Sequence, residues 1–174
     1  PSPSAAETRA NRTFDALLWA LSRPGQLRRL PAPGPEPIAE ALLDGECRVW
    51  AADPLLIPAL LRTGAALSEL PQADHAFLGP LAGAALLEQL AIGSDLYPDD
   101  GATAVIAVRL GEGPRLRLTG PGIEGAAELA VACLPEGVWQ TRARCLRYPM
   151  GFDLILLDGD TIAGIPRSTH VEAL

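Results

Sequence analysis

A two-residue turn near the C-terminus is the feature that most constrains the fold of this chain. Asp158-Gly159 separates two apolar runs, residues 153–157 and 160–165. Asp-Gly between such runs is a favoured turn of a β-hairpin, because the turn needs residues that tolerate positive φ. The sequence therefore predicts two antiparallel strands here, and the rest of the domain has to accommodate them.

Upstream of this hairpin, helical and strand-like patterns alternate along the chain. The segments that read as helices are 7–22, 38–43, 55–62, 83–90 and 135–147. The runs that read as strands are 47–50, 75–78, 102–110 and 115–119, with 26–30 as a short extended piece. This order predicts one α/β domain over residues 1–174, with a three-layer mixed sheet and flanking helices. Residues 1–6 are expected to be disordered.

Three local expectations follow from these patterns. Phe14, Leu17, Leu18 and Leu21 recur at helical spacing and form the expected apolar side of the first helix. The alternating run 115–119 is expected to pair with 102–110 across a turn at 111–114. The segment 124–134 fits neither a helix nor a strand pattern clearly and is left unassigned.

The charge of the chain excludes several classes of function. All 14 basic residues are arginines, so the chain can neither form a Schiff base with pyridoxal phosphate nor supply the lysine of a P-loop. No cofactor is expected. A net charge of −7 argues against binding to nucleic acid, and the apolar stretches are too short for a membrane span.

The cysteines point to a reducing compartment. Cys47, Cys133 and Cys145 are odd in number and widely spaced, which argues against a disulfide framework. No signal-peptide pattern opens the chain, so a cytoplasmic location is expected. All three thiols are expected to be buried among apolar side chains. The cysteines and the two histidines lack the spacing of metal ligands, and no metal is expected; His75 is expected to be a packed histidine.

The segment 165–170 is the best candidate for a functional site. Within it, Arg167 offers a planar donor fork suited to phosphate or phosphonate oxygens, and Ser168 and Thr169 add hydroxyl donors beside His170. On an extended chain, Arg167 and Thr169 share one face. Three interpretations remain open: an oxyanion site, an arginine paired with an acidic residue, or a contact with a partner protein.

Other candidate residues carry weaker signals. Gly120 and Gly122 follow a strand, and their turn is either an anion nest or simply a tight turn. Arg23 comes directly after the first helix, where capping is its ordinary role. Asp153 could complete a hydrolytic triad with Ser168 and His170, but no nucleophile elbow surrounds the serine.

Three ordered motifs carry a resemblance to a known family. They are Leu-Thr-Gly-Pro-Gly-Ile at 118–123, Tyr-Pro-Met-Gly-Phe-Asp-Leu-Ile-Leu at 148–156 and Pro-Arg-Ser-Thr at 166–169, and the first helix ends in Leu-Ser-Arg-Pro-Gly. In this order they resemble the PhnH family of phosphonate metabolism. Tyr148, Phe152 and Ser168 depart mildly from the family pattern.

The resemblance implies a subunit of the carbon–phosphorus lyase core complex, working with the G, I and J subunits. That complex converts an alkylphosphonate and ATP to ribose 1-alkylphosphonate 5-triphosphate, and this subunit is required without being known to catalyse the step alone. The resemblance also implies a homodimer, and a fold similar to the large domain of pyridoxal-phosphate-dependent transferases but without the cofactor. A phosphonate or a nucleotide is the candidate ligand, and whether this subunit binds a ligand at all stays open.

Two alternatives of other classes stay open. One is a free-standing, oxyanion-binding enzyme that acts on a small molecule and uses Asp153 or His170 as acid or base. The other is a pure scaffold protein whose arginines anchor interfaces.

Overall fold

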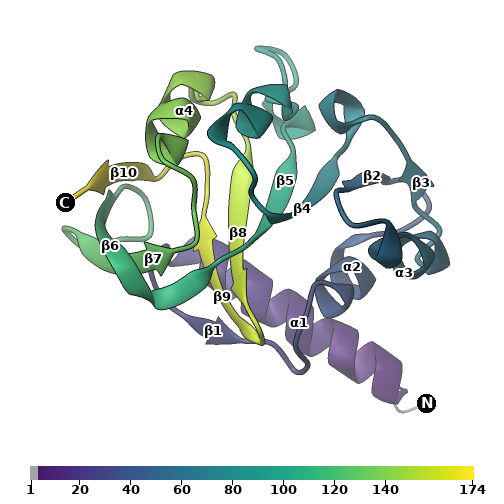
Figure 1. The fold of residues 1–174 in the computed structure, drawn as a ribbon. Coiled ribbons are helices and arrows are strands. Elements are labelled where there is room, and N and C mark those ends of the chain that lie inside the picture. The colour runs from purple at the N-terminus through teal and green to yellow at the C-terminus, as the bar shows by residue number, and fades with distance from the viewer. Residues whose placement is uncertain (1–3) are drawn as a thin grey trace.

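The computed structural model describes residues 4–174, and a seven-stranded mixed sheet lies at its centre (Figure 1). The strand order is β1-β9-β8-β5-β4-β2-β3. The bounds are β1 Arg28–Arg29, β2 Arg48–Ala51, β3 Ala66–Leu67, β4 His75–Pro80, β5 Thr103–Ala107, β8 Asp153–Asp158 and β9 Thr161–Ile165. The strands from β3 to β8 in this order are parallel, whereas β8 and β9, and β9 and β1, pair antiparallel. The predicted mixed α/β sheet is confirmed.

The predicted hairpin is confirmed as the pair β8 and β9. Asp158 pairs with Thr161, so the two turn residues are Gly159 and Asp160, one position later than predicted. Gly159 takes φ of +59°, which a side chain disfavours and glycine tolerates. The hairpin thus carries the chain from the parallel part of the sheet into its antiparallel edge.

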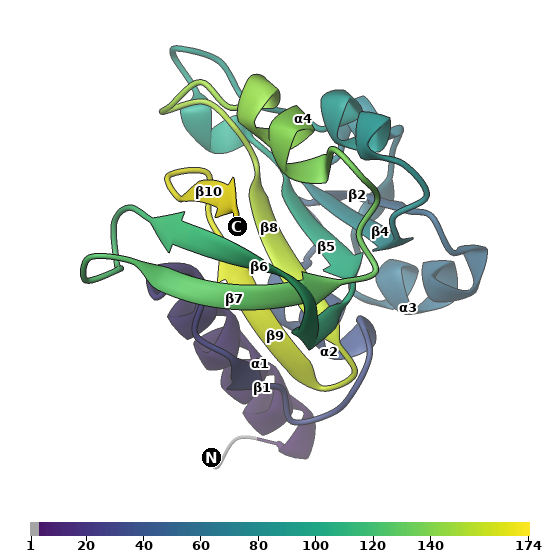
Figure 2. The same cartoon turned by 60° about the vertical axis from the view of Figure 1, so that its left-hand side comes forward.

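A second, three-stranded antiparallel sheet packs over the first, and Figure 2 shows β6 and β7 crossing over β8 and β9. Its order is β10-β6-β7, with bounds β6 Arg109–Thr119, β7 Ala127–Ala132 and β10 His170–Ala173. The predicted pairing of 115–119 with 102–110 is wrong, because β5 already has β4 on one side and β8 on the other. The segment 115–119 pairs instead with β7, which fills the unassigned stretch 124–134, and with β10.

Helices cover both faces of the large sheet. The α-helices are α1 Ala5–Ser22, α2 Glu36–Leu42, α3 Ile57–Arg62 and α4 Val138–Cys145. The 3-10 helices are η1 Pro54–Leu56, η2 Leu70–Gln72, η3 Ala84–Gln89 and η4 Pro98–Asp100. The predicted helix at 83–90 is therefore of the tighter 3-10 type, and the one at 135–147 is shorter than predicted. A core with α1, α2 and α3 lies on one face, and a core with α4, η3 and the small sheet lies on the other.

The first helix begins with a capping box. The Ser4 hydroxyl accepts from the backbone N–H of Glu7, and the Glu7 carboxylate accepts from the backbone N–H of Ser4. The predicted disorder of residues 1–6 falls partly on residues 1–3, which lie outside the described residues. Ser4 to Ala6 instead cap and begin α1.

The buried side of α1 is narrower than its sequence predicts. Thr13, Leu17 and Ala20 are buried, but Phe14 is 48% exposed and Leu18 is 58% exposed. Because α1 lies along the β1–β9 edge of the sheet and against α2, these neighbours cover only one stripe of it. The predicted apolar side therefore includes two residues, Phe14 and Leu18, that lie outside the core.

The cysteines also differ from expectation. Cys133 is exposed, and Cys47 and Cys145 are only partly buried, so the expected burial of all three thiols is wrong. All three are free thiols. No helix within residues 4–174 is both long and apolar enough to cross a membrane.

Candidate functional site

The segment 165–170 forms a turn and not an extended strand. The backbone N–H of Thr169 donates to the carbonyl of Pro166 at 2.9 Å, with Arg167 and Ser168 between them. The chain leaves the large sheet at Ile165 and enters the small sheet as β10, so it has to change direction here. The expectation that Arg167 and Thr169 share one face of an extended chain is wrong, because the segment turns at Arg167 and Ser168.

Arg167 forms an ion pair with Asp153, the first residue of β8. The guanidinium Nη2 lies 2.8 Å from Asp153 Oδ2, and Nε donates to both carboxylate oxygens at 3.3 Å. The backbone N–H of Arg167 donates to Oδ1 as well, at 2.7 Å. The two side chains are only 16% and 21% exposed. Asp153 therefore offsets the charge of Arg167 and also accepts a hydrogen bond from the backbone of the turn.

The same guanidinium reaches the loop before β5. Nη1 donates to the carbonyl of Pro98, and Nη2 donates to the carbonyl of Gly101 at 3.3 Å. Arg167 thus joins the turn, the start of β8 and the loop between η4 and β5. With its charge offset by Asp153 and its donors directed at acceptors of this chain, it has little left to offer a ligand.

Arg142, on α4, approaches the turn from the other side. Its Nη2 donates to the carbonyl of Pro166 at 2.8 Å and its Nη1 to the carbonyl of Thr169 at 3.1 Å. Arg142 is 2% exposed, and its burial lowers the pKa to about 10, while the charge of Asp153 opposes this shift. The guanidinium therefore stays protonated at neutral pH. The sequence places Arg142 only in a helix and does not indicate this burial.

A cavity of about 280 Å³ lies between α4 and the turn, and we call it the α4 cavity. Its walls are Trp139, Arg142, Ala143, Leu146, Tyr148, Arg167, Ser168, Thr169, His170 and Val171. The structure thus brings together the four candidates of the segment 165–170 and adds Arg142. Two polar atoms of these walls, Arg142 Nε and Thr169 Oγ1, are buried without a hydrogen-bond partner.

The glycines of the 118–123 turn serve close packing. A Cβ on Gly120 would lie 2.7 Å from the carbonyl oxygen of Ser168, and a Cβ on Gly122 would lie 2.1 Å from that of Ser22. Both glycines also have positive φ, +134° and +80°. The turn therefore packs between the end of α1 and the segment 165–170, which accounts for both glycines without a ligand.

Arg23 lies elsewhere on the surface. Its guanidinium stacks 3.6 Å from the ring centroid of Trp19, and the guanidinium of Arg28 lies 3.7 Å from the same centroid. Arg23 does not line the α4 cavity, so the structure does not join it to the other candidates.

The triad of Ser168, His170 and Asp153 has no supporting hydrogen bond. The carboxylate of Asp153 accepts from Arg167, and no bond joins it to His170 within the described part of the chain. Within residues 4–174, no three His, Cys, Asp or Glu side chains lie together so that they could hold a metal ion. His75 is partly buried, and this burial lowers its pKa below the ordinary value.

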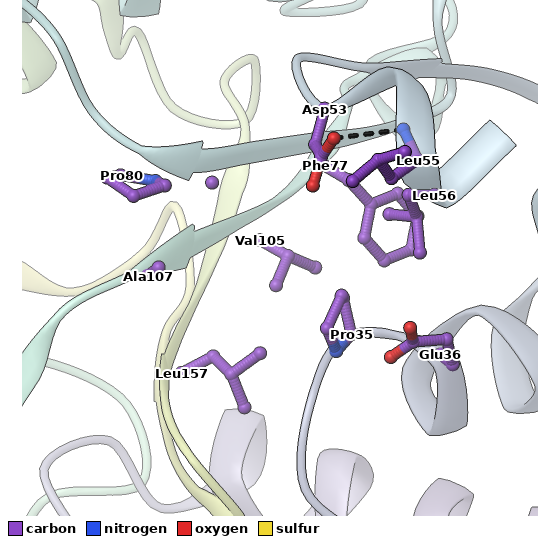
Figure 3. Close-up of a pocket in the computed structure, with 11 residues that line it drawn as sticks. Pro35, Glu36, Asp53, Leu55, Leu56, Phe77, Pro80, Val105, Ala107 and Leu157 are labelled. Carbon is purple, nitrogen blue, oxygen red and sulfur yellow. Dashed lines mark hydrogen bonds between the residues drawn. The ribbon is translucent and has the colours of Figure 1, made fainter.

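A second cavity, of about 290 Å³, opens at the carboxyl ends of β4, β5 and β8 (Figure 3). Phe77, Val105 and Leu157 line it from the sheet. Its polar side chains are the carboxylates of Glu36 and Asp53, and Asp53 also accepts from the backbone N–H of Leu55 at 2.9 Å. We call it the carboxyl-edge cavity; apolar walls with two carboxylates do not suit an anion.

Comparisons with known proteins agree with the sequence motifs. The family model described as bacterial phosphonate metabolism protein (PhnH) matches residues 4–172. A putative C-P lyase subunit protein HtxG from Stutzerimonas stutzeri is 37% identical over 173 residues, covering 94% of this chain and 86% of the relative. The subunit PhnH of alpha-D-ribose 1-methylphosphonate 5-triphosphate synthase from Rhizobium meliloti (strain 1021) is 29% identical over 187 residues, covering 94% and 90%.

Proposed function

This chain belongs to the PhnH family of bacterial phosphonate metabolism proteins, and from that premise we propose that it is a subunit of a carbon–phosphorus lyase. The observation that carries the proposal is the match of the family model over residues 4–172, nearly the whole chain. The complex to which it contributes converts an alkylphosphonate and ATP to ribose 1-alkylphosphonate 5-triphosphate, in keeping with the name of the Rhizobium meliloti relative.

Within the complex we propose a structural or substrate-assisting role. Asp153, the acid or base of the alternative enzyme hypothesis, is occupied by Arg167 and so is poorly placed to exchange a proton with a substrate. This favours a subunit that assists the transferase reaction over a free-standing enzyme. A pure scaffold protein would differ from the proposed assisting subunit only in binding no ligand.

The proposed likeness to the large domain of pyridoxal-phosphate-dependent transferases is supported by the seven-stranded mixed sheet with helices on both faces. The cofactor itself does not fit this chain. Without a lysine the internal aldimine cannot form, and the carboxyl-edge cavity carries two carboxylates and no cation among its walls. The proposed likeness therefore concerns the fold and not the chemistry.

We propose the other lyase subunits, G, I and J, and a second copy of this chain as partners. The outer side of α1 supports a protein contact, because Phe14 and Leu18 lie one helical turn apart and both are exposed. We assign this α1 surface, defined by these two residues, to another lyase subunit, since both relatives are named as subunits. The three free thiols support a reducing, cytoplasmic location.

The proposal is tested by growth on a phosphonate. Deletion of this gene from its host should abolish growth with methylphosphonate as the sole phosphorus source and leave growth on inorganic phosphate unchanged. A tagged copy should restore growth and co-purify with the G, I and J subunits in fixed stoichiometry. Unimpaired growth of the deletion strain on methylphosphonate, with a tagged chain that elutes alone, would contradict the proposed function.

A further inference from the structure

The α4 cavity contains a positive charge that the described chain does not balance. Arg142 is 2% exposed, and its guanidinium donates only to the neutral carbonyls of Pro166 and Thr169. Among residues 4–174 no carboxylate forms an ion pair with Arg142. Asp153 does exert an attraction on it, but Arg167 already pairs with that carboxylate. A buried guanidinium without a counter-charge is unfavourable, so an anion in this cavity would be stabilising.

Two of the residues that line this cavity also carry a buried polar group without a partner. Arg142 Nε carries an N–H and Thr169 Oγ1 a hydroxyl, and neither has a hydrogen-bond partner. Thr169 is 2% exposed, so its hydroxyl is not simply at the surface. Buried polar atoms are nearly always hydrogen-bonded in native proteins. Two donors left over by the side chains of a single cavity indicate a group that supplies acceptors.

We propose that the α4 cavity binds a small tetrahedral oxyanion, the phosphonate or phosphate group of a ligand, through Arg142 and Thr169. The oxyanion offers both a negative charge for the guanidinium and acceptors for the two free donors. Ser168 and His170, in the same walls, supply further polar contacts. Arg167 is a positioning residue, because its bonds to Asp153 fix the turn that carries Thr169.

The size and the walls of the cavity limit which class of oxyanion it can bind. Its volume of about 280 Å³ is at the lower limit of small-molecule sites and suits a head group better than a whole nucleotide. Trp139, Leu146 and Val171 give it an apolar side beside the guanidinium. An alkylphosphonate combines an oxyanion with an apolar group in this way. This choice among oxyanions rests on the proposed function, whereas the anion site itself does not.

The test is calorimetric titration of the purified chain with methylphosphonate, inorganic phosphate and sulfate. Thr169→Val keeps the shape of the side chain and removes a hydroxyl that has no partner in the chain, so it should leave the melting temperature unchanged. It should weaken binding of the anion about tenfold, the usual effect of losing one hydrogen bond to a charged group. Thr161→Val, in β9 and outside the cavity, is the matched control and should bind as the parent does. Arg142→Gln should abolish binding.

The outcomes distinguish a phosphonate ligand from a phosphate group, and the anion-site proposal from the proposed function. Tighter binding of methylphosphonate than of phosphate supports a phosphonate ligand, and equal binding supports the phosphate group of a sugar or nucleotide. The site is refuted if no anion binds to the parent at millimolar concentration, or if Thr169→Val binds as tightly as Thr161→Val does. Should Arg142→Gln fail to fold, Thr169→Val still decides. A chain that supports growth on methylphosphonate but binds no anion contradicts this inference alone.

Discussion

At the scale of single residues, two arginines around one turn have different environments. Arg167 faces a carboxylate and two carbonyls, so its charge is offset within the chain. Arg142 faces carbonyls only. The sequence singles out Arg167 because it stands among hydroxyl-bearing residues, yet both side chains have the same donors. What distinguishes them is the position of Asp153, which is adjacent to the turn only in the folded chain.

Removing the largely buried ion pair of Arg167 and Asp153 should destabilise the fold more than removing an exposed ion pair does. Arg167→Ala removes the ion pair and both carbonyl bonds, and leaves a largely buried carboxylate with one backbone donor. We expect the free energy of unfolding, measured with urea, to fall by about 2–4 kcal/mol. Arg48→Ala is the matched control, since Arg48 and Asp74 form a pair that is shorter, at 2.6 Å against 2.8 Å, but more exposed, and it should cost less than about 1 kcal/mol. Equal losses in the two variants would show that burial of the Arg167 pair is energetically unimportant.

At the scale of elements, the motifs that identify the family meet in space. The end of α1 touches the 118–123 turn through Ser22 and Gly122, and this turn touches the segment 165–170 through Gly120 and Ser168. Asp153, from the motif at 148–156, forms an ion pair with Arg167, from the motif at 166–169. Much of the sequence signature therefore specifies how backbones approach one another around the turn and not which groups meet a ligand.

This interpretation predicts a clear difference between two glycines of one loop. Gly122→Ala places a Cβ 2.1 Å from the carbonyl oxygen of Ser22, and a backbone atom cannot move aside cheaply. Gly125 also has positive φ, +71°, but nothing lies within 4 Å of its Cβ position. Gly125→Ala should cost about 1–2 kcal/mol for the left-handed backbone alone. Gly122→Ala should cost about 2 kcal/mol more, seen as a melting temperature lower by several degrees. Similar melting temperatures would mean that the chain relaxes around Gly122.

The elements also show what the sequence can predict and where it stops. The hairpin and the buried strand at 102–110 depend on local turn chemistry and apolar runs, and both were predicted within a few residues. The partner of 115–119 is set by which strand edges are free, and this depends on the complete sheet order. Likewise, the sequence groups the four residues 167–170 because they are adjacent along the chain, whereas Arg142 comes from a distant helix. Both the pairing of 115–119 and the position of Arg142 depend on residues that are distant in sequence and adjacent only in the folded chain, and the sequence pattern does not show such neighbours.

At the scale of the whole molecule, two different cavities lie at opposite ends of the parallel strands. The α4 cavity adjoins the turn that Arg167 ties to the amino ends of β5 and β8, and it carries a surplus of positive charge. The carboxyl-edge cavity lies at the other ends of these strands and contains only carboxylates as charged groups among its walls. Of these two cavities, the α4 cavity is therefore the one that suits an anion, although the net charge of the chain is −7. The net negative charge of the chain should repel anions and so suppress their unspecific binding to the rest of the surface.

The α1 surface predicts how the molecule meets its complex. Phe14 and Leu18 are exposed and contribute little to the core, so changing both to Ser should leave the free energy of unfolding within about 1 kcal/mol of the parent. If another lyase subunit covers this surface, the double variant should no longer co-purify with that subunit, because the contact loses its apolar centre. Leu55, which is 87% exposed at the rim of the carboxyl-edge cavity, is the matched control. Leu55→Ser should leave assembly intact. If the α1 variant instead changes only the mass of the isolated chain from dimer to monomer, the surface belongs to the homodimer, and our assignment to a second kind of subunit is wrong.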